Sequence, residues 1–217
     1  MSERARTRVL LTAFGPFPGV PVNATMRLVP ALEESVARHF PDVRCRTLML
    51  ATEWLTAPGR VAEARREEPF DLVLHFGVSS RARGFEVETR ARNACQHAPD
   101  AAGALPPGPY LESGGPAHLP VSLPVRHIVS RLRARGIPAF ASRDAGAYLC
   151  NAVLFHSLAE APGLPLARTG FIHIPATLAR PGGANRGRSG ACPLTWEQAL
   201  DGGIEIIAAS LGRPWRR

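Results

Sequence analysis

Short, continuously apolar runs alternate along this chain with longer segments whose apolar residues recur at helical spacing. Residues 70–76 form one such run, and an unbroken run of that length is typical of a parallel strand covered on both faces. In the segment 26–39, by contrast, Leu28, Leu32 and Val36 recur every fourth residue. This alternation predicts an α/β protein, built as a three-layer α/β/α sandwich around a mostly parallel twisted sheet.

Capping and turn residues set the boundaries of the expected elements. Thr25 can cap the helix 26–39, and Gln198 stands three residues after Thr195, as a capping box at the start of the last helix requires. The expected strands are residues 9–14, 43–50, 70–76, 85–93, 137–141 and 170–174. Of the other expected helices, one begins near residue 56, one spans 124–135 and one carries Cys150 as far as residue 158.

Length and cysteine spacing limit the organisation. With 217 residues the chain is long enough for one sizeable core and short for two ordinary domains, so we expect a single domain over residues 1–217. The Pro- and Gly-rich segments 98–118 and 181–190 are expected to be flexible loops. No apolar run has the length of a membrane helix or of a secretory signal. Widely spaced cysteines, without a Cys-x-x-Cys pair or a Cys/His cluster, predict free thiols, a cytoplasmic location and no metal.

The net charge of +8 comes from arginine alone, because the sequence contains no lysine. The arginines are scattered along the whole chain, whereas a nucleic-acid footprint requires clustering on one face. We therefore attribute the basic balance to a compositional bias and expect no nucleic-acid partner. One local concentration is interpreted as solvated surface, with contact to an acidic substrate or a partner subunit as the alternative. It comprises Arg81, Arg83, Arg90 and Arg92.

Two segments carry the residue types that a thiol hydrolase requires. Residues 142–151 read Ser-Arg-Asp-Ala-Gly-Ala-Tyr-Leu-Cys-Asn, and residues 170–175 read Gly-Phe-Ile-His-Ile-Pro. Cys150 thus opens an expected helix and His173 ends an expected buried strand. A helix N-terminus and a neighbouring imidazolium both favour a nucleophilic thiolate. Active sites of open α/β sheets lie at the carboxyl ends of strands, where we expect these two residues to meet.

Each of these residues has a structural alternative. A lone cysteine is more often a buried, packed thiol than a nucleophile, and a histidine between two isoleucines can be a core residue bonded to backbone. His75 and His156 are weaker candidates for the catalytic base. The acid that orients the histidine is sought in residues 85–93, where strand alternation places Glu86 and Glu88 on one face.

With these residues assembled, the chain resembles pyroglutamyl peptidase I, a family of cysteine peptidases that remove an N-terminal pyroglutamyl residue. The cysteine segment 142–151 is the most specific match. Residues 13–19, Ala-Phe-Gly-Pro-Phe-Pro-Gly, resemble the family's opening motif, and Glu88 follows Gly77 by eleven residues, as in the segment that carries the family's catalytic glutamate. Further matches lie in the same order at Asn23, Ala91, Asn93, residues 122–124 and residues 170–175.

The resemblance implies a cysteine exopeptidase that forms an acyl-enzyme, with Cys150 as nucleophile, His173 as its base and Glu88 as the orienting acid. It also implies that Phe14 and Phe17, which could otherwise be loop packing, wall a pocket for the flat pyroglutamyl lactam. Because the lactam has no ammonium group, that pocket is expected to be aromatic and free of carboxylates. The implied partner is a small peptide with a blocked N-terminus; no cofactor or metal is expected, and a homo-oligomer is left open.

The chain departs from the family pattern around the glutamate. Val78 stands where the family commonly has glutamine, Thr89 stands where it has arginine, and residues 80–83 replace a glycine-rich segment. The family register nevertheless favours Glu88 over Glu86. These departures leave two alternative functions. One is a thiol amidase acting on another small cyclic or N-acylated amide, and the other is a non-catalytic binding protein that has kept the fold.

Overall fold

A six-stranded sheet forms the centre of the computed structural model, which describes residues 6–159, 167–179 and 192–215. Its strand order is β2-β1-β3-β8-β4-β7. The strands are β1 (Thr7–Phe14), β2 (Val43–Leu50), β3 (Leu72–Ser79), β4 (Phe85–Glu88), β7 (Ala139–Ser142) and β8 (Arg168–Pro175). The first four in this order are parallel, whereas β4 pairs antiparallel with β8 and β7 runs parallel to β4. The sheet is therefore mostly parallel, with two reversed strands at one edge.

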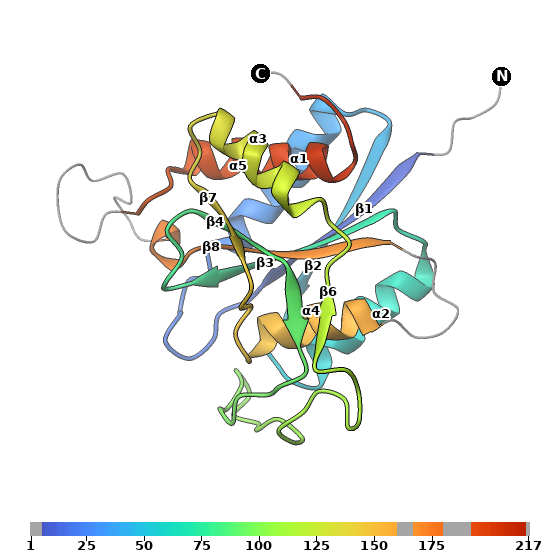
Figure 1. Ribbon diagram of the computed structural model, residues 1–217, viewed down its shortest axis with the longest axis vertical. Helices are drawn as coiled ribbons and strands as arrows, with labels where there is room; N and C mark the ends of the chain where they lie inside the picture. Colours follow the sequence, from blue (N-terminus) through green and yellow to red (C-terminus); the bar gives the residue numbers. More distant parts are fainter. Residues whose placement is uncertain (1–5, 160–166, 180–191, 216–217) are drawn as a thin grey trace.

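Helices cover both faces of this sheet (Figure 1). On one face lie α1 (Thr25–His39), α3 (Val125–Ala134) and α5 (Trp196–Ser210), and on the other lie α2 (Thr56–Glu67) and α4 (Leu149–Ala159). The three-layer α/β/α sandwich predicted from the sequence is confirmed. Within the ranges that the structure describes, no helix is both long enough and apolar enough to cross a membrane.

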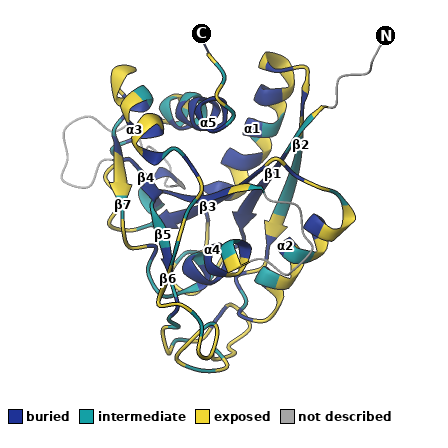
Figure 2. Ribbon diagram, turned by 45° about the vertical axis from the view of Figure 1, so that its right-hand side comes forward, coloured by how far each residue is buried: buried dark blue, intermediate teal, exposed yellow. Residues whose placement is uncertain are grey.

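Each face of the sheet has its own apolar core, because successive strand residues point to opposite faces. Leu74 and Ile172 belong to the core under α1, α3 and α5, whereas their strand neighbours Val73 and Phe171 belong to the core under α2 and α4. Figure 2 shows the helix sides that face the sheet as buried and the outer sides as exposed. A second, two-stranded sheet of β5 (Arg90–Arg92) and β6 (His118–Pro120) also contacts α4.

The segment expected as one strand over residues 85–93 forms two strands in two different sheets. The chain changes sheet at Thr89, whose N–H and hydroxyl each donate to the carbonyl of Ser142 at 2.8 Å. The carbonyl of Thr89 accepts the N–H of Val121 at 3.1 Å. Apolar and polar residues alternate in the same way before and after Thr89, so the sequence pattern does not mark the point where one strand ends and the next begins. The short strand β6, at the end of the expected loop 98–118, was also not predicted.

Hydrogen bonds of Asp100 and Asn93 help to hold the expected long loop to the domain. Residues 98–117 contain no helix or strand. The carboxylate of Asp100 accepts the N–H of Trp54 at 2.9 Å and two N–H groups of its own loop. The side-chain amide of Asn93 donates to the carbonyl of Glu112 and accepts its N–H. The other expected loop, 181–190, lies outside the described residues.

One of the two predicted helix caps is confirmed. The hydroxyl of Thr195 accepts the N–H of Gln198 at 3.1 Å, and the side chain of Gln198 accepts the N–H of Thr195, which completes the capping box of α5. The prediction for Thr25 is wrong, because the N-cap of α1 is Ala24. The Thr25 hydroxyl instead donates to the side-chain carbonyl of Asn23 at 2.8 Å.

Candidate active site

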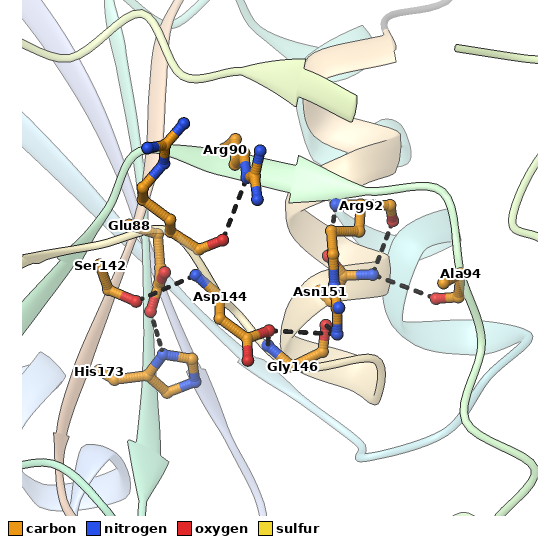
Figure 3. A network of polar contacts seen from close by, with 10 residues as sticks. Glu88, Arg90, Arg92, Ala94, Ser142, Asp144, Gly146, Asn151 and His173 are labelled. Atoms are coloured by element: carbon orange, nitrogen blue, oxygen red, sulfur yellow. Dashed lines mark hydrogen bonds and ion pairs between the residues drawn. The ribbon is translucent and has the colours of Figure 1, made fainter. Parts of the chain in front are cut away.

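His173 and Glu88 meet across two neighbouring antiparallel strands. β8 carries His173, and its register partner on β4 is Glu86, so the side chains of Glu86 and Glu88 project from the same face as the imidazole. Nδ1 of His173 lies 2.9 Å from Oε1 of Glu88 (Figure 3). Glu88 is completely buried and His173 is 5% exposed. A pair so well shielded from water is only weakly screened by salt, and it fixes the orientation of the ring.

Glu86 lies beside this pair without bonding to the imidazole. One donor atom from each of Glu86, Glu88 and His173 lies within 4.8 Å of the other two, and this is the one such cluster with metal-ligand geometry among the described residues. Nδ1 of the ring is already engaged by Glu88. The sequence-based expectation of a site without metal stays a prediction.

Cys150 lies in the first turn of α4, where backbone N–H groups have no acceptor within the helix. A β-carbon placed on Gly77 would be 3.0 Å from Sγ of Cys150 and 2.7 Å from the ring of Phe171. Gly77 is also the register partner of His173 on β3. The glycine therefore leaves the space that the sulfur occupies, directly beside the strand that carries the imidazole.

The surroundings of His173 favour its protonated form. Burial by itself lowers the pKa of His173, but the charge and hydrogen bond of Cys150, followed by those of Glu88, outweigh burial and raise this pKa from 6.5 to about 10. The ring thus carries its proton at neutral pH, between the sulfur and the carboxylate. An imidazolium next to a cysteine stabilises the thiolate, which is the nucleophilic form.

A pocket of about 440 Å³ opens over Cys150 and His173 and has two chemically different sides. The apolar side, next to β1 and β3, is lined by Phe17, Val20 and Val78. The charged side, next to β4 and β7, is lined by Arg81, Glu86, Ser142 and Asp144. The expectation of a pocket without carboxylates is therefore wrong for the pocket as a whole, and both of its carboxylates lie on the charged side.

The two phenylalanines expected to wall the pocket lie in different places. Phe17 lines the pocket, and its ring centroid is 6.1 Å from that of Tyr148, another lining residue. Tyr148 in turn packs edge-on against Trp54 at 5.2 Å. Phe14 is not among the lining residues: it is 2% exposed, and its ring packs at 6.2 Å from Phe171 in the core beneath the site.

Asn151 fastens the start of α4 to the small sheet. Its side-chain amide donates to the carbonyls of Arg92 at 2.8 Å and Ala94 at 3.2 Å, and it accepts the N–H of Arg92 at 2.8 Å (Figure 3). Asn151 is fully buried, so these bonds satisfy its whole side chain. Because Asn151 is adjacent to Cys150 in the first turn, this clamp also fixes the position of the sulfur.

Two of the four arginines in the predicted basic concentration have a structural task at the site. Arg92 donates to the carbonyl of Gly146 at 3.2 Å and pairs with Asp144 at 3.1 Å, which braces the turn before α4. Arg90 donates to another carbonyl of the same turn at 3.1 Å, and Arg81 lines the pocket. The interpretation as solvated surface is therefore wrong for Arg90 and Arg92, whereas Arg81 is exposed at the pocket.

The two weaker histidine candidates do not line the pocket. His75 is completely buried, with one ring nitrogen 2.8 Å from the hydroxyl of Thr12 and the other 3.0 Å from that of Ser157. Burial, and then the charge of Arg65, lower the pKa of His75 to about 3, so this ring stays neutral. His156 is exposed on the outer side of α4.

Cys150 and His173 come together by a different route from the one expected. The sheet rule for α/β proteins assumes strands that run in one direction, but β7 and β8 run in opposite directions. Their carboxyl ends therefore do not share an edge. The turn at residues 143–148 leads the chain back from β7 and places Cys150 against Gly77.

Several residues of the site had no role in the sequence-based prediction. Tyr148 and Asn151 stood within the cysteine segment, but neither was assigned a function. For Asn151 a signal existed, because an amide inside an otherwise apolar helix must find hydrogen-bond partners once it is buried. Tyr148 gave no comparable signal, since its position beside Phe17 depends on two loops that are far apart in the sequence.

Comparisons with known proteins agree with one another. The family model described as pyroglutamyl peptidase matches residues 7–208. The pyrrolidone-carboxylate peptidase of Klebsiella pneumoniae is 33% identical over 202 residues, which is 91% of each chain, and that of Clavibacter michiganensis is 34% identical over 171 residues, covering 77% of this chain and 78% of its own. The crystal structure of pyroglutamyl peptidase I from Bacillus amyloliquefaciens superposes with a TM-score of 0.81 at 27% identity, covering 95% of this chain and 98% of its own.

Proposed function

The chain belongs to the pyroglutamyl peptidase family of cysteine peptidases, and we propose that it hydrolyses the amide bond after an N-terminal pyroglutamyl residue with Cys150, His173 and Glu88 as its catalytic residues. The observation that carries this proposal is the continuous contact from the Cys150 sulfur through His173 to the buried Glu88, beneath a pocket of about 440 Å³. Of the alternatives raised by the sequence, membership in a peptidase family speaks against a non-catalytic binding protein.

In the first step, the thiolate of Cys150 attacks the carbonyl carbon of the scissile amide, which lies outside the lactam ring of the pyroglutamyl group. The carbonyl oxygen becomes an oxyanion, which we expect backbone N–H groups in the first turn of α4 to bind. The tetrahedral intermediate then collapses. The C–N bond breaks, the imidazolium of His173 donates its proton to the leaving nitrogen, and a thioester to Cys150 remains.

In the second step, His173 acts in the opposite sense. It is now neutral, and it takes a proton from a water molecule that attacks the thioester carbonyl. The second tetrahedral intermediate releases pyroglutamate and regenerates the thiolate beside the imidazolium. Throughout both steps, Glu88 holds the ring by the Nδ1 contact at 2.9 Å and stabilises its positive charge.

The apolar side of the pocket suits the acyl part of the substrate. A pyroglutamyl ring is flat and neutral, and Phe17, Val20 and Val78 offer it an apolar wall without charged groups. Phe14 packs against Phe171 in the core under α2 and α4, and we assign it no direct contact with the substrate. The leaving amine then lies on the other side of His173, toward β4.

Turnover of a fluorogenic pyroglutamyl amide tests the proposal directly. We expect the protein to release the fluorophore, and we expect mass spectrometry after rapid acid quenching to find the pyroglutamyl mass on the peptide that contains Cys150. Release of the fluorophore by the Cys150→Ala variant would contradict the nucleophile. A reduced, folded protein that ignores pyroglutamyl amides but cleaves another small N-acylated amide would favour the thiol amidase alternative.

A further inference from the structure

The order of strands in the sheet divides the pocket around the reacting atoms. Cys150 lies against Gly77 on β3, His173 lies on β8, and Glu86 lies on β4, so that sulfur, imidazole and Glu86 follow one another across three adjacent strands. The acyl group of the proposed substrate takes the apolar side, next to β1 and β3. The residue that follows the scissile bond must then lie on the charged side, over β4 and the turn after β7.

On this charged side, Glu86 is the acid that lacks a partner. Its side chain lines the pocket and is partly buried, and no hydrogen bond or ion pair joins it to another described residue. Burial raises the pKa of Glu86, as does the charge of Glu88, while the charges of His173 and Arg81 act in the opposite direction. A carboxylate that has lost part of its hydration in this way gains most from a cation that comes into contact with it.

The other charged groups of this side are less able to bind a cation. Asp144 is already paired with Arg92 at 3.1 Å, and it also accepts the N–H of Gly146. Arg81 is exposed on the loop between β3 and β4, so its interaction with Glu86 is screened by solvent. The charge of Arg81 helps to keep Glu86 ionised, but Arg81 forms no ion pair with it.

We propose that the charged side is a binding site for a cationic side chain, so that the enzyme prefers peptides in which arginine or lysine follows the pyroglutamyl residue, with Glu86 as the residue that binds the cation. This inference rests on the proposed function, since it concerns the leaving group of that same reaction. Its chemistry is that of a charge-assisted hydrogen bond between a guanidinium or ammonium group and a carboxylate.

The test compares three amidated dipeptides: pyroglutamyl-arginine amide, pyroglutamyl-citrulline amide and pyroglutamyl-glutamate amide. Citrulline has nearly the shape of arginine and no charge, and the amide removes the terminal carboxylate from all three. Product formation by chromatography gives kcat/KM for each. We expect the wild type to cleave the arginine substrate about two- to fivefold faster than the citrulline substrate, the range for a partly exposed charge pair, and the glutamate substrate more slowly than both.

Three variants locate the effect. In Glu86→Gln the arginine-to-citrulline ratio is expected to fall to about one, and because the ratio is taken within each variant, any change in the chemistry at His173 cancels. Glu34→Gln removes the same charge from an exposed position of α1, on the opposite face of the sheet, and is expected to keep the wild-type ratio. Arg81→Gln is expected to keep or increase the ratio.

The outcomes separate this inference from the proposed function. Equal rates on the arginine and citrulline substrates in the wild type, or a ratio that survives Glu86→Gln, would overturn the cation site while pyroglutamyl hydrolysis stands. A ratio that is lost in Arg81→Gln would place the selectivity elsewhere and overturn the role of Glu86. Absence of cleavage of all three dipeptides would overturn the proposed function and this inference with it.

Discussion

A β-carbon on Gly77 would lie 3.0 Å from the sulfur of Cys150, although the two residues are more than seventy positions apart in the sequence. The same β-carbon would lie 2.7 Å from the buried ring of Phe171. Gly77 is also paired in register with His173. The place of the proposed nucleophile therefore depends on a missing side chain in the neighbouring strand.

Replacing Gly77 by alanine is expected to displace Cys150 and to lower kcat/KM for a pyroglutamyl amide at least tenfold. A contact of 2.7 Å with a buried ring also overpacks the core, at a cost of about 1–3 kcal/mol in unfolding free energy. Gly59→Ala is the control, because Gly59 is exposed in α2 and has no atom within 4 Å of its ideal β-carbon. That variant should keep its activity, and its unfolding free energy should increase by about 0.5–1 kcal/mol. Full activity in Gly77→Ala would refute this account of the site.

Glu88→Gln is expected to lower turnover on the order of a hundredfold or more with little change in stability. The glutamine can still occupy the space beside Nδ1 of His173, but it cannot stabilise the imidazolium by charge. Glu86→Gln should affect turnover of a pyroglutamyl fluorogenic amide much less, since Glu86 makes no bond to the ring. Steady-state kinetics of both variants check this, and the reverse ranking would show that the orienting acid is Glu86.

Alkylation by iodoacetamide at neutral pH is expected to modify Cys150 first. The loss of activity should be proportional to the fraction of Cys150 that is modified. Burial, followed by the charge of Glu33, raises the pKa of Cys45 to about 12, and burial also raises the pKa of Cys95. Both thiols should therefore react slowly. Peptide mapping by mass spectrometry identifies the modified residue. Alanine variants of Cys45, Cys95 and Cys192 should keep most of their activity, and inactivation through any of these three thiols would contradict the assignment.

Pyroglutamyl amides are expected to be cleaved on the order of a hundredfold faster, in kcat/KM, than glutaminyl or prolyl amides. The latter share the size or ring shape of the pyroglutamyl group but carry an ammonium at neutral pH. The apolar side of the pocket, with Phe17 and Val78, contains no group that could pair with it. The carboxylates that do line the pocket lie beyond His173, on the charged side. Comparable rates on prolyl amides would show that the acyl group binds against Glu86.

Acidification is expected to destabilise the protein through His75. In the folded state burial lowers the pKa of His75 to about 3, below its ordinary value of 6.5, so the unfolded state binds more protons. The contribution to stability is complete above pH 6.5 and decreases as the pH falls toward 3, by about 1.4 kcal/mol per pH unit. Urea unfolding at pH 6.5 and pH 5 should show that the unfolding free energy of the wild type falls by about 1.6 kcal/mol more than that of His75→Gln. Equal losses would mean that His75 is protonated in the folded protein.

Several features of the fold could be predicted from local sequence alone. Apart from the segment 85–93, apolar periodicity identified the strands of the main sheet and the five described α-helices to within a few residues, because burial on one or both faces leaves a repeating pattern in the chain. The capping box of Thr195 and Gln198 was equally local, since both of its hydrogen bonds join residues three positions apart. The cysteine segment and the histidine segment, read against a known family, were enough to nominate Cys150 and His173.

Other features were decided only by the tertiary structure, because they depend on which distant segments pair. The alternation of residues along the strand placed both Glu86 and Glu88 on the same face and could not distinguish them. Only the packing of β4 against β8 shows that Glu88 contacts the imidazole of His173. The division of residues 85–93 between two sheets followed from hydrogen bonds of Thr89 to segments more than thirty residues away. The sequence by itself thus determined the order and type of most elements and which residues can do chemistry. Which residues contact each other was decided by the pairing of strands that are distant in the sequence. The energy of this pairing is spread over whole strands, so it leaves no signal in the local sequence of either partner.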